Sequence, residues 1–573
     1  MDSLKKTGNI IITLILFFAV WHNSYSQKLD FEEIKVVAPY LPTISEAFKI
    51  LENPSMEDTT KISTTFEYSI KPMKITTSFE VEPISPARMR GEPLTKLYKG
   101  HAKAGFGTHS TPYVEAFYNS LRSNEYAYGA RIKHLSSSGN IENYEYSQFS
   151  NNLIDVYGKK FYKNLTLNAD MNYQRDMVHY YGFQRKDFLN NQNALDYIDN
   201  LTSDDLKQSF NIFNVGINYI TNHLDSAKFQ HSAAFKYRLF TDRFDTKENL
   251  YKISGIIGQQ LPPDPLGFAE TQHFNLFANA DFYSYSILDK KTSNGLISLE
   301  PRLSSQYRDF KFYIGLDIVT QFDNLTYMKF YPKAHAEANL VSDVLIAYGT
   351  FSGGLDKHDL YNTTRINPYL NTALDIPYKF QNRKKDLTVG FKGSISTFVA
   401  YNFSVSDATI DNFAFFVNDT TQLLDNKFTL VYDNISRFNF KAEIFTQIGE
   451  RFRLRLATDY YEYSMDKENQ PWHMPSIVVS VNGKYNIQDK IIISLDGYAR
   501  NSTFAKTYDV SNNVVAKELE GFHVDANIGI EYRYTRVLSV FLNFNNIQNQ
   551  PLQQWNNYQT QRFNFIGGVS YSF

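Results

Sequence analysis

The run Phe563 to Phe573, FNFIGGVSYSF, alternates between two kinds of side chain. Its odd positions are mostly large and apolar, and its even positions are mostly small and polar. Because a β-strand points successive side chains to opposite faces, the run predicts a strand with one aromatic face and one polar face. Such a strand at an open sheet edge would promote aggregation in a soluble protein. A closed barrel in a membrane, with lipid outside and water inside, has no open edge.

The same alternation recurs along the chain. In the stretch 437–448, Phe438 and Phe440 begin an apolar series that alternates with polar and charged residues. In 451–460, Leu454 and Leu456 alternate with arginines. Charges on the hidden face of a strand would be very costly in a soluble sandwich, whereas in a barrel they face a wet lumen. The pattern predicts an all-β fold, a transmembrane antiparallel β-barrel of the outer-membrane type with an even number of strands, roughly 16–22.

Composition agrees with this fold and excludes several functions. The 573 residues include 41 Tyr and 46 Phe, which suits the aromatic girdles of a membrane barrel. The net charge of -2 argues against a nucleic-acid partner. The absence of cysteine excludes disulfides, thiolate chemistry and a lipoprotein anchor cysteine. Beyond the N-terminus, no uncharged apolar run approaches the length of a spanning helix.

Residues 1–26 have the pattern of a signal peptide. Lys5 and Lys6 precede the apolar run Ile10–Val20, and Ser24-Tyr25-Ser26 places small residues before a cleavage site at Gln27. The alternative is an uncleaved anchor helix. We expect export to the outer membrane of a Gram-negative bacterium, with outer-membrane lipids as partners.

The rest of the chain divides into two parts. Residues 27–95 contain seven of the 18 prolines, so this segment is not expected to form regular barrel strands. We interpret it as an extension that lies along the periplasm or enters the barrel. Residues 96–573 are predicted to form the barrel.

Loop lengths give an orientation, because barrels of this kind have short periplasmic turns and longer extracellular loops. Ser120–Asn124 and Asp489-Lys490 have the length of periplasmic turns. The expected long extracellular loops are Arg175–Lys207, Thr241–Glu270, Lys357–Asp386 and Thr503–Glu518.

Two short regions resemble TonB-dependent receptor barrels. The end of the chain has Asn545, Asn546 and Ile547 on the strand before the last loop, aromatic residues in that loop, and a closing strand that ends in Phe. Asn367-Pro368-Tyr369-Leu370, followed by the strand-like run Leu387–Gly393, is similar to a second element of the same family. The resemblance implies this type of barrel in the outer membrane.

One feature departs from that family. Such receptors carry a plug domain between the signal peptide and the first strand, and the interval 27–95 is shorter than a full plug. The resemblance therefore implies the barrel type without carrying over the energised uptake mechanism or a ligand. A TonB box would be a short, extended, β-prone segment near the mature N-terminus, and Glu33, Ile34, Lys35, Val36 and Val37 fit that description. The alternative is an ordinary edge segment.

Enzyme signatures are missing from the sequence. It has no His-Glu-x-x-His zinc motif, no phosphate-binding glycine-rich loop and no Gly-x-Ser-x-Gly elbow. We therefore expect no enzymatic activity, no metal and no cofactor.

One constellation of charges stands out, on the predicted lumen face of two consecutive strands. Its members are Arg437, Lys441, Glu443, Arg451, Arg453, Arg455 and Asp459. They form either a solvated wall or an anion-selective, ligand-steering patch, since rings of like charge bias what passes a pore.

Three functions remain open. The first is solute transport across the outer membrane by a TonB-receptor-like barrel. The second is a non-conducting barrel that serves as a subunit of a larger assembly, with outer-membrane or periplasmic protein partners. The third is an outer-membrane enzyme.

Overall fold

The computed structural model describes residues 97–221, 229–262, 269–323, 325–375, 378–509, 511–519 and 521–573. The chain divides into two compact units, Met1–Thr95 and Lys96–Phe573, and all described residues belong to the second. The predicted signal peptide, the proline-rich extension and the TonB-box segment Glu33–Val37 lie outside the described residues.

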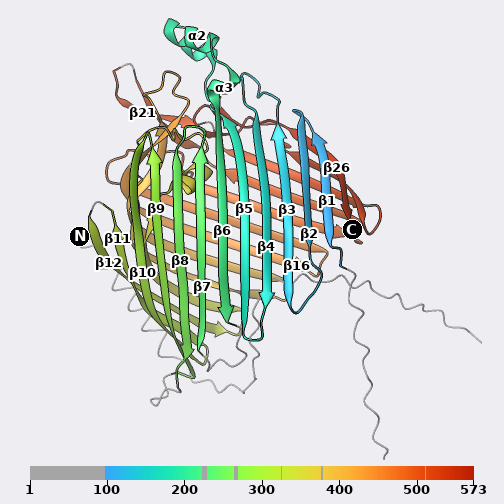
Figure 1. Cartoon of the computed structure of the whole chain (residues 1–573), viewed down its shortest axis with the longest axis vertical. Coiled ribbons are helices and arrows are strands. Elements are labelled where there is room, and N and C mark those ends of the chain that lie inside the picture. The colour runs from blue at the N-terminus through green and yellow to red at the C-terminus, as the bar shows by residue number, and fades with distance from the viewer. Residues whose placement is uncertain are drawn as a thin grey trace, which may run out of the picture. The chain divides into compact units, whose positions relative to one another are not determined.

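The second unit is a closed antiparallel barrel of 22 strands (Figure 1). Each strand pairs with the next barrel strand along the chain, and the last pairs with the first. The predicted barrel with an even strand number is confirmed. Its strands are β1 (Gly100–Gly107), β2 (Thr111–Asn119), β3 (Tyr126–Ser137), β4 (Phe149–Phe161), β5 (Leu165–His179), β6 (Lys207–Thr221), β7 (Gln230–Asp242), β8 (Lys247–Gln260), β9 (Thr271–Ile287), β10 (Lys290–Tyr307), β11 (Phe310–Phe322), β12 (Thr326–Val341), β13 (Leu345–Lys357), β14 (Phe380–Ser396), β15 (Val399–Asn418), β16 (Phe428–Ile448), β17 (Phe452–Met465), β18 (Ile477–Ile487), β19 (Ile491–Arg500), β22 (His523–Arg533), β23 (Leu538–Asn545) and β26 (Asn564–Ser572).

The remaining elements lie in the loops at one end of the barrel, at the top of Figure 1. They are η1 (Arg185–Phe188), α2 (Gln192–Asp199), α3 (Ser203–Leu206), α4 (Leu360–Ile366) and the hairpins β20 (Thr503–Tyr508)–β21 (Val514–Leu519) and β24 (Gln553–Trp555)–β25 (Tyr558–Gln559). The longer loops are extracellular in such barrels, which orients this end outward. No helix among the described residues is long and apolar enough to cross a membrane.

The barrel closes at the seam between β26 and β1. The backbone N–H of Gly100 donates to the Phe573 carbonyl oxygen and the N–H of Phe573 donates to the Gly100 carbonyl oxygen, each over 2.9 Å. Gly568 lies opposite Gly105 across this seam, and a Cβ added to Gly568 would lie 2.1 Å from the Ala104 carbonyl oxygen. Gly568 is therefore required for the close approach of β26 to β1.

The predicted two faces are confirmed. On β16, the even-numbered Phe438 and Phe440 are 38% and 40% exposed, and they point outward to where lipid lies. Tyrosines including Tyr118, Tyr485 and Tyr532 are exposed near the ends of strands opposite the long loops. This ring has the position of the periplasmic aromatic girdle.

The predicted connections are partly right. Ser120–Asn124 and Asp489-Lys490 lie in tight turns on the side opposite the long loops, as predicted. The loop prediction for Thr241–Glu270 is wrong, because β8 takes up 14 residues in the middle of this range and the connection from β7 to β8 is short. Two glycines, Gly255 and Gly258, together with a polar start, obscured the alternation of β8.

Neighbouring residues on β16 allow a test of the two faces. Phe440→Arg places a charge on the lipid face and should cost about 2–4 kcal/mol of unfolding free energy near the bilayer midplane. Asn439→Arg places the same charge on the lumen face and should be nearly neutral. Urea unfolding of the barrel from lipid vesicles measures both, and equal losses would contradict this assignment of faces.

Candidate functional site

The extracellular loops fold into the barrel and form a buried core. This loop core consists of side chains from four loops packed against side chains of the barrel strands. The loop residues are Ile141, Tyr144, Tyr181, Leu360, Leu370, Tyr378, Trp555 and Tyr558, and the strand residues are Phe210, Ile212, Phe240, Leu250, Tyr283, Tyr285, Ile287, Phe416, Phe428 and Leu430. Loops that start at strands far apart around the barrel therefore meet over the lumen.

Aromatic stacking holds the centre of the loop core. The rings of Tyr369 and Tyr558 stack with centroids 3.5 Å apart, and Tyr181 packs edge-on against both, at 5.8 and 4.9 Å. The Tyr181 hydroxyl donates to the Gln559 carbonyl oxygen over 2.8 Å. Burial raises the pKa of Tyr181, Tyr369 and Tyr558, so these hydroxyls remain protonated donors.

The two regions that carry the family resemblance meet at this point. Asn546 adopts a left-handed φ of 47°, and its side-chain amide donates to the carbonyl oxygens of Gln550 and Gln561 over 2.6 and 3.1 Å. Asn367 is fully buried, and its side-chain oxygen accepts from the Tyr369 backbone N–H over 2.9 Å. These asparagines therefore shape the two loops that bring Tyr369 and Tyr558 together.

A buried ion cluster fixes α4 to the barrel wall. The Arg238 guanidinium on β7 donates to Glu248 Oε1 over 3.0 Å and to Asp359 Oδ2 over 2.7 Å. Asp359 is the N-cap of α4, and its other oxygen accepts from the Asn362 N–H. Glu248 in turn accepts from the Leu360 N–H over 2.6 Å. The helix is thus held by charge-assisted hydrogen bonds in the interior.

His473 joins a further loop to the loop core. Its Nδ1 lies 3.0 Å from the Phe416 carbonyl oxygen, and its Nε2 lies 3.2 Å from the Asn556 backbone nitrogen. This pairing fits the neutral ring, with Nδ1 donating and Nε2 accepting. Burial lowers the pKa of His473 to about 4. The imidazole is therefore a neutral link between the loop that carries Trp472 and the loop that carries Trp555.

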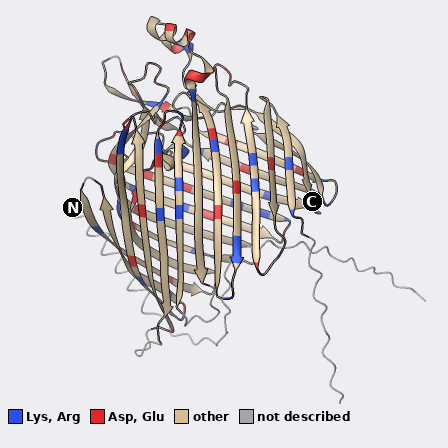
Figure 2. Ribbon diagram, in the orientation of Figure 1, with Lys and Arg blue, Asp and Glu red and all other residues tan. Residues whose placement is uncertain are grey.

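The structure places the predicted charges on neighbouring elements. Arg437, Lys441 and Glu443 lie on the lumen face of β16, Arg453, Arg455 and Asp459 lie on that of β17, and Arg451 lies in the turn between the strands. Arg455 Nε lies 2.5 Å and Lys441 Nζ 3.9 Å from Glu443, so this carboxylate pairs with two of the cations. Acidic and basic residues occur on strands around the whole barrel (Figure 2).

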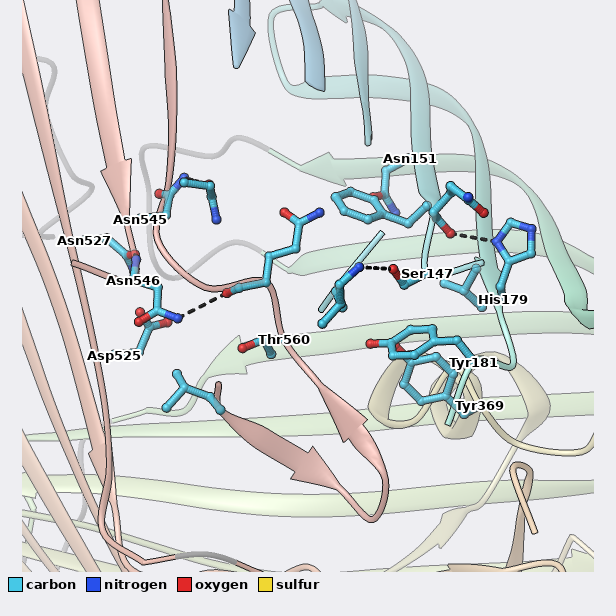
Figure 3. A pocket seen from close by; sticks show the side chains of 17 residues that line it. Ser147, Asn151, His179, Tyr181, Tyr369, Asp525, Asn527, Asn545, Asn546 and Thr560 are labelled. Carbon is cyan, nitrogen blue, oxygen red and sulfur yellow. Dashed lines mark hydrogen bonds between the residues drawn. The ribbon is translucent and has the colours of Figure 1, made fainter. Parts of the chain in front are cut away.

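A cavity of about 360 Å³, lined by both polar and apolar surface, lies beside the loop core (Figure 3). One side is formed by β4, β5 and the loops that follow β3 and β5, and the other by β22, β23 and the last loop. Tyr181 and Tyr369 line both the cavity and the loop core. Among the described residues, no group of three His, Asp or Glu side chains could hold a metal ion.

Sequence reasoning missed the loop core and this cavity, because it treated the long loops as simple external connections. A signal was present in the aromatic residues of those loops, such as Tyr180, Tyr181, Trp472 and Trp555, since no membrane girdle needs them there.

Removing Arg238 should destabilise the loop core. Arg238→Met leaves the buried carboxylates of Glu248 and Asp359 without their cation, a loss of about 3–5 kcal/mol. The temperature at which the folded, fast-migrating gel band disappears should fall. The control adds Glu248→Gln and Asp359→Asn, which removes the charges and should recover most of the loss. An unchanged single variant would contradict the role of this cluster.

Acid should loosen the loop core through His473. In the folded protein the pKa of His473 is about 4, below its usual value of about 6.5. The neutral imidazole therefore stabilises the folded loop core fully above about pH 6.5, and this contribution to the free energy of unfolding is lost as the pH falls through about 4. The loss at low pH reaches about 3 kcal/mol.

Tryptophan fluorescence can measure this effect. The chain has three tryptophans, of which Trp472 and Trp555 lie in the loops and Trp21 lies in the predicted signal peptide. Emission of the mature chain should shift to the red between pH 7 and pH 4, and His473→Gln should suppress most of the shift. An equal shift in the variant would assign the effect to another group.

Comparison with known proteins identifies the fold. No protein-family model and no curated protein sequence matches the chain. Among solved structures, it is similar to the pyoverdine outer membrane receptor FpvA from Pseudomonas aeruginosa bound to pyoverdine, with 10% identity, a TM-score of 0.62, and coverage of 84% of this chain and 79% of that chain. The siderophore receptor PirA from Acinetobacter baumannii has 10% identity and a TM-score of 0.62, with coverage of 84% of this chain and 81% of that chain. The FrpB iron transporter from Neisseria meningitidis has 11% identity and a TM-score of 0.61, with coverage of 84% of this chain and 82% of that chain.

These neighbours are receptors and transporters rather than enzymes. The alternation, the 22 closed strands and these likenesses agree with one another. The chain is an outer-membrane β-barrel with the fold of the TonB-dependent receptors.

Proposed function

We propose that this protein is an outer-membrane receptor that takes up a solute from outside the cell. The observation that carries the proposal is the loop core, which packs loops together over a charged, polar lumen in a barrel of the receptor type. A barrel of this width is too wide for its own wall side chains to fill. The loops then close the lumen at rest and must move when a solute passes.

The lumen charges on β16 and β17 have a role in this proposal. The five cations Arg437, Lys441, Arg451, Arg453 and Arg455 outnumber the two anions Glu443 and Asp459. Glu443 pairs with Arg455 and Lys441 on this wall. Charges of both signs keep the wall solvated, which suits the passage of a polar solute.

Locking one loop tests whether movement is required. Leu370 forms an isolated bridge with Phe428 of β16, and bridged neighbours lie at a separation that a disulfide can span. The double variant Leu370→Cys/Phe428→Cys introduces the only cysteines of the chain. In the oxidising environment outside the inner membrane the pair should form a disulfide.

The readout is the depletion of solutes from a defined medium by cells with and without the gene. Wild-type protein and each single-cysteine variant should restore a depletion that the deletion strain lacks, and the locked variant should not. A locked variant with full uptake would refute loop movement. If the deletion strain depletes every solute normally and the protein co-purifies in mild detergent with a fixed partner, the chain is a non-conducting subunit instead.

A further inference from the structure

The cavity beside the loop core has an unusual lining. Seven of its 17 residues carry side-chain amides, and none is Lys or Arg. The amides are Gln148, Asn151, Asn527, Asn545, Asn546, Gln561 and Asn564. Asp525 supplies a carboxylate. The lining therefore offers many hydrogen-bond donors and acceptors and no positive side chain to attract an anion.

Two acceptors in this lining are left without partners. Asp525 Oδ1 and Gln148 Oε1 are buried and have no hydrogen-bond partner among the described residues. A buried polar atom without a partner is costly, so each is suited to a donor that a ligand brings. His179 is already engaged, because its ring nitrogens lie 2.8 Å from the Gln148 carbonyl oxygen and 3.0 Å from Ser203 Oγ.

The amides are held in place by one another and by the backbone. Asn545 Nδ2 donates to Asn564 Oδ1 over 2.8 Å, and Asn527 Oδ1 accepts from the Asn546 backbone N–H over 2.9 Å. Figure 3 shows Asn527, Asn545 and Asn546 gathered on one side of the cavity, opposite Tyr181 and Tyr369. The polar groups are thus positioned before a ligand arrives, which lowers the entropic cost of binding.

We infer that this cavity binds a neutral, hydroxyl-rich ligand the size of one or two sugar rings. A hydroxyl both donates and accepts, as a side-chain amide does, so the two are matched partners. The Asp525 carboxylate accepts hydrogen bonds from hydroxyl groups and repels anionic ligands. The volume of about 360 Å³ holds roughly a dozen water-sized groups. Tyr181 and Tyr369 offer aromatic surface to the C–H groups of a ring.

This inference names the solute class for the proposed uptake and rests on that function only for its biological purpose. The binding test uses the purified full chain in detergent on an array of neutral and acidic oligosaccharides, followed by calorimetric titration of the best neutral sugar. Asp525→Asn keeps the shape and removes the charge. It should weaken binding of the neutral sugar about ten- to a hundredfold.

The matched control is Asp170→Asn, which removes a carboxylate from the lumen face of β5 outside the cavity. It should leave the dissociation constant unchanged. Heat-dependent gel migration shows that both variants are folded. Preference for acidic sugars, no binding to any neutral sugar, or equal effects of the two substitutions would each overturn the site.

Uptake of the same sugar by cells separates the two proposals. If the sugar binds to the purified protein, but cells with and without the protein deplete it equally from the medium, the binding site is supported and the proposed transport function is refuted. If cells need the protein to deplete another solute from the medium, and no neutral sugar binds to the purified protein, the transport function is supported and the proposed sugar site is refuted.

Discussion

The hydrocarbon interior of a membrane contains no water to which backbone N–H and C=O groups could form hydrogen bonds, so these groups must bond within the protein. The rest of this structure depends on that constraint. Each membrane-crossing strand needs a partner strand on both sides to pair all of its N–H and C=O groups, so the sheet must close on itself. The closure is visible at Gly100 and Phe573, where the backbone N–H of each residue donates a hydrogen bond to the carbonyl oxygen of the other. Small residues at Gly105 and Gly568 allow the last strand to approach the first closely enough. Closure with 22 strands then creates a wide interior, and this width sets the second problem of the fold.

The loops answer that second problem. Outside the membrane a loop does not need to alternate apolar and polar residues as a membrane-crossing strand does. Several loops of this protein bury aromatic side chains inside the barrel. Burial of rings such as those of Tyr181, Tyr369 and Tyr558 supplies the apolar contact that a water-facing wall cannot provide. Some of the accompanying charges are paired locally, as with Arg238 between Glu248 and Asp359, whereas the buried Tyr285 and Tyr378 hydroxyls have no hydrogen-bond partner among the described residues. The loop core therefore resembles the interior of a soluble domain enclosed by a membrane barrel.

The barrel could be predicted from sequence because its signal is local. Phe440 and Asn439 reveal their faces through their immediate neighbours, and the period of two is set by the strand itself. Within β8 the same reasoning failed, since glycines and a polar start hide the period. The loop core was beyond such reasoning because its contacts join distant segments. Tyr369 and Tyr558 stack only when two loops separated by eight barrel strands turn inward, and no local pattern encodes that meeting.

The cavity and the loop core share Tyr181 and Tyr369, so the two features are not independent. A ligand shifts the position of loops only to the extent that it binds one arrangement better than another. A ligand in the amide-lined cavity would contact the side chains that hold the centre of the loop core, and its binding energy would then differ between the packed and displaced arrangements. Tyr369 belongs to the loop that α4 and the Arg238 cluster tie to the wall. In the proposed function, the cavity therefore lies next to the contacts that would break before a solute passes, and reciprocal coupling between the two would follow from their common residues.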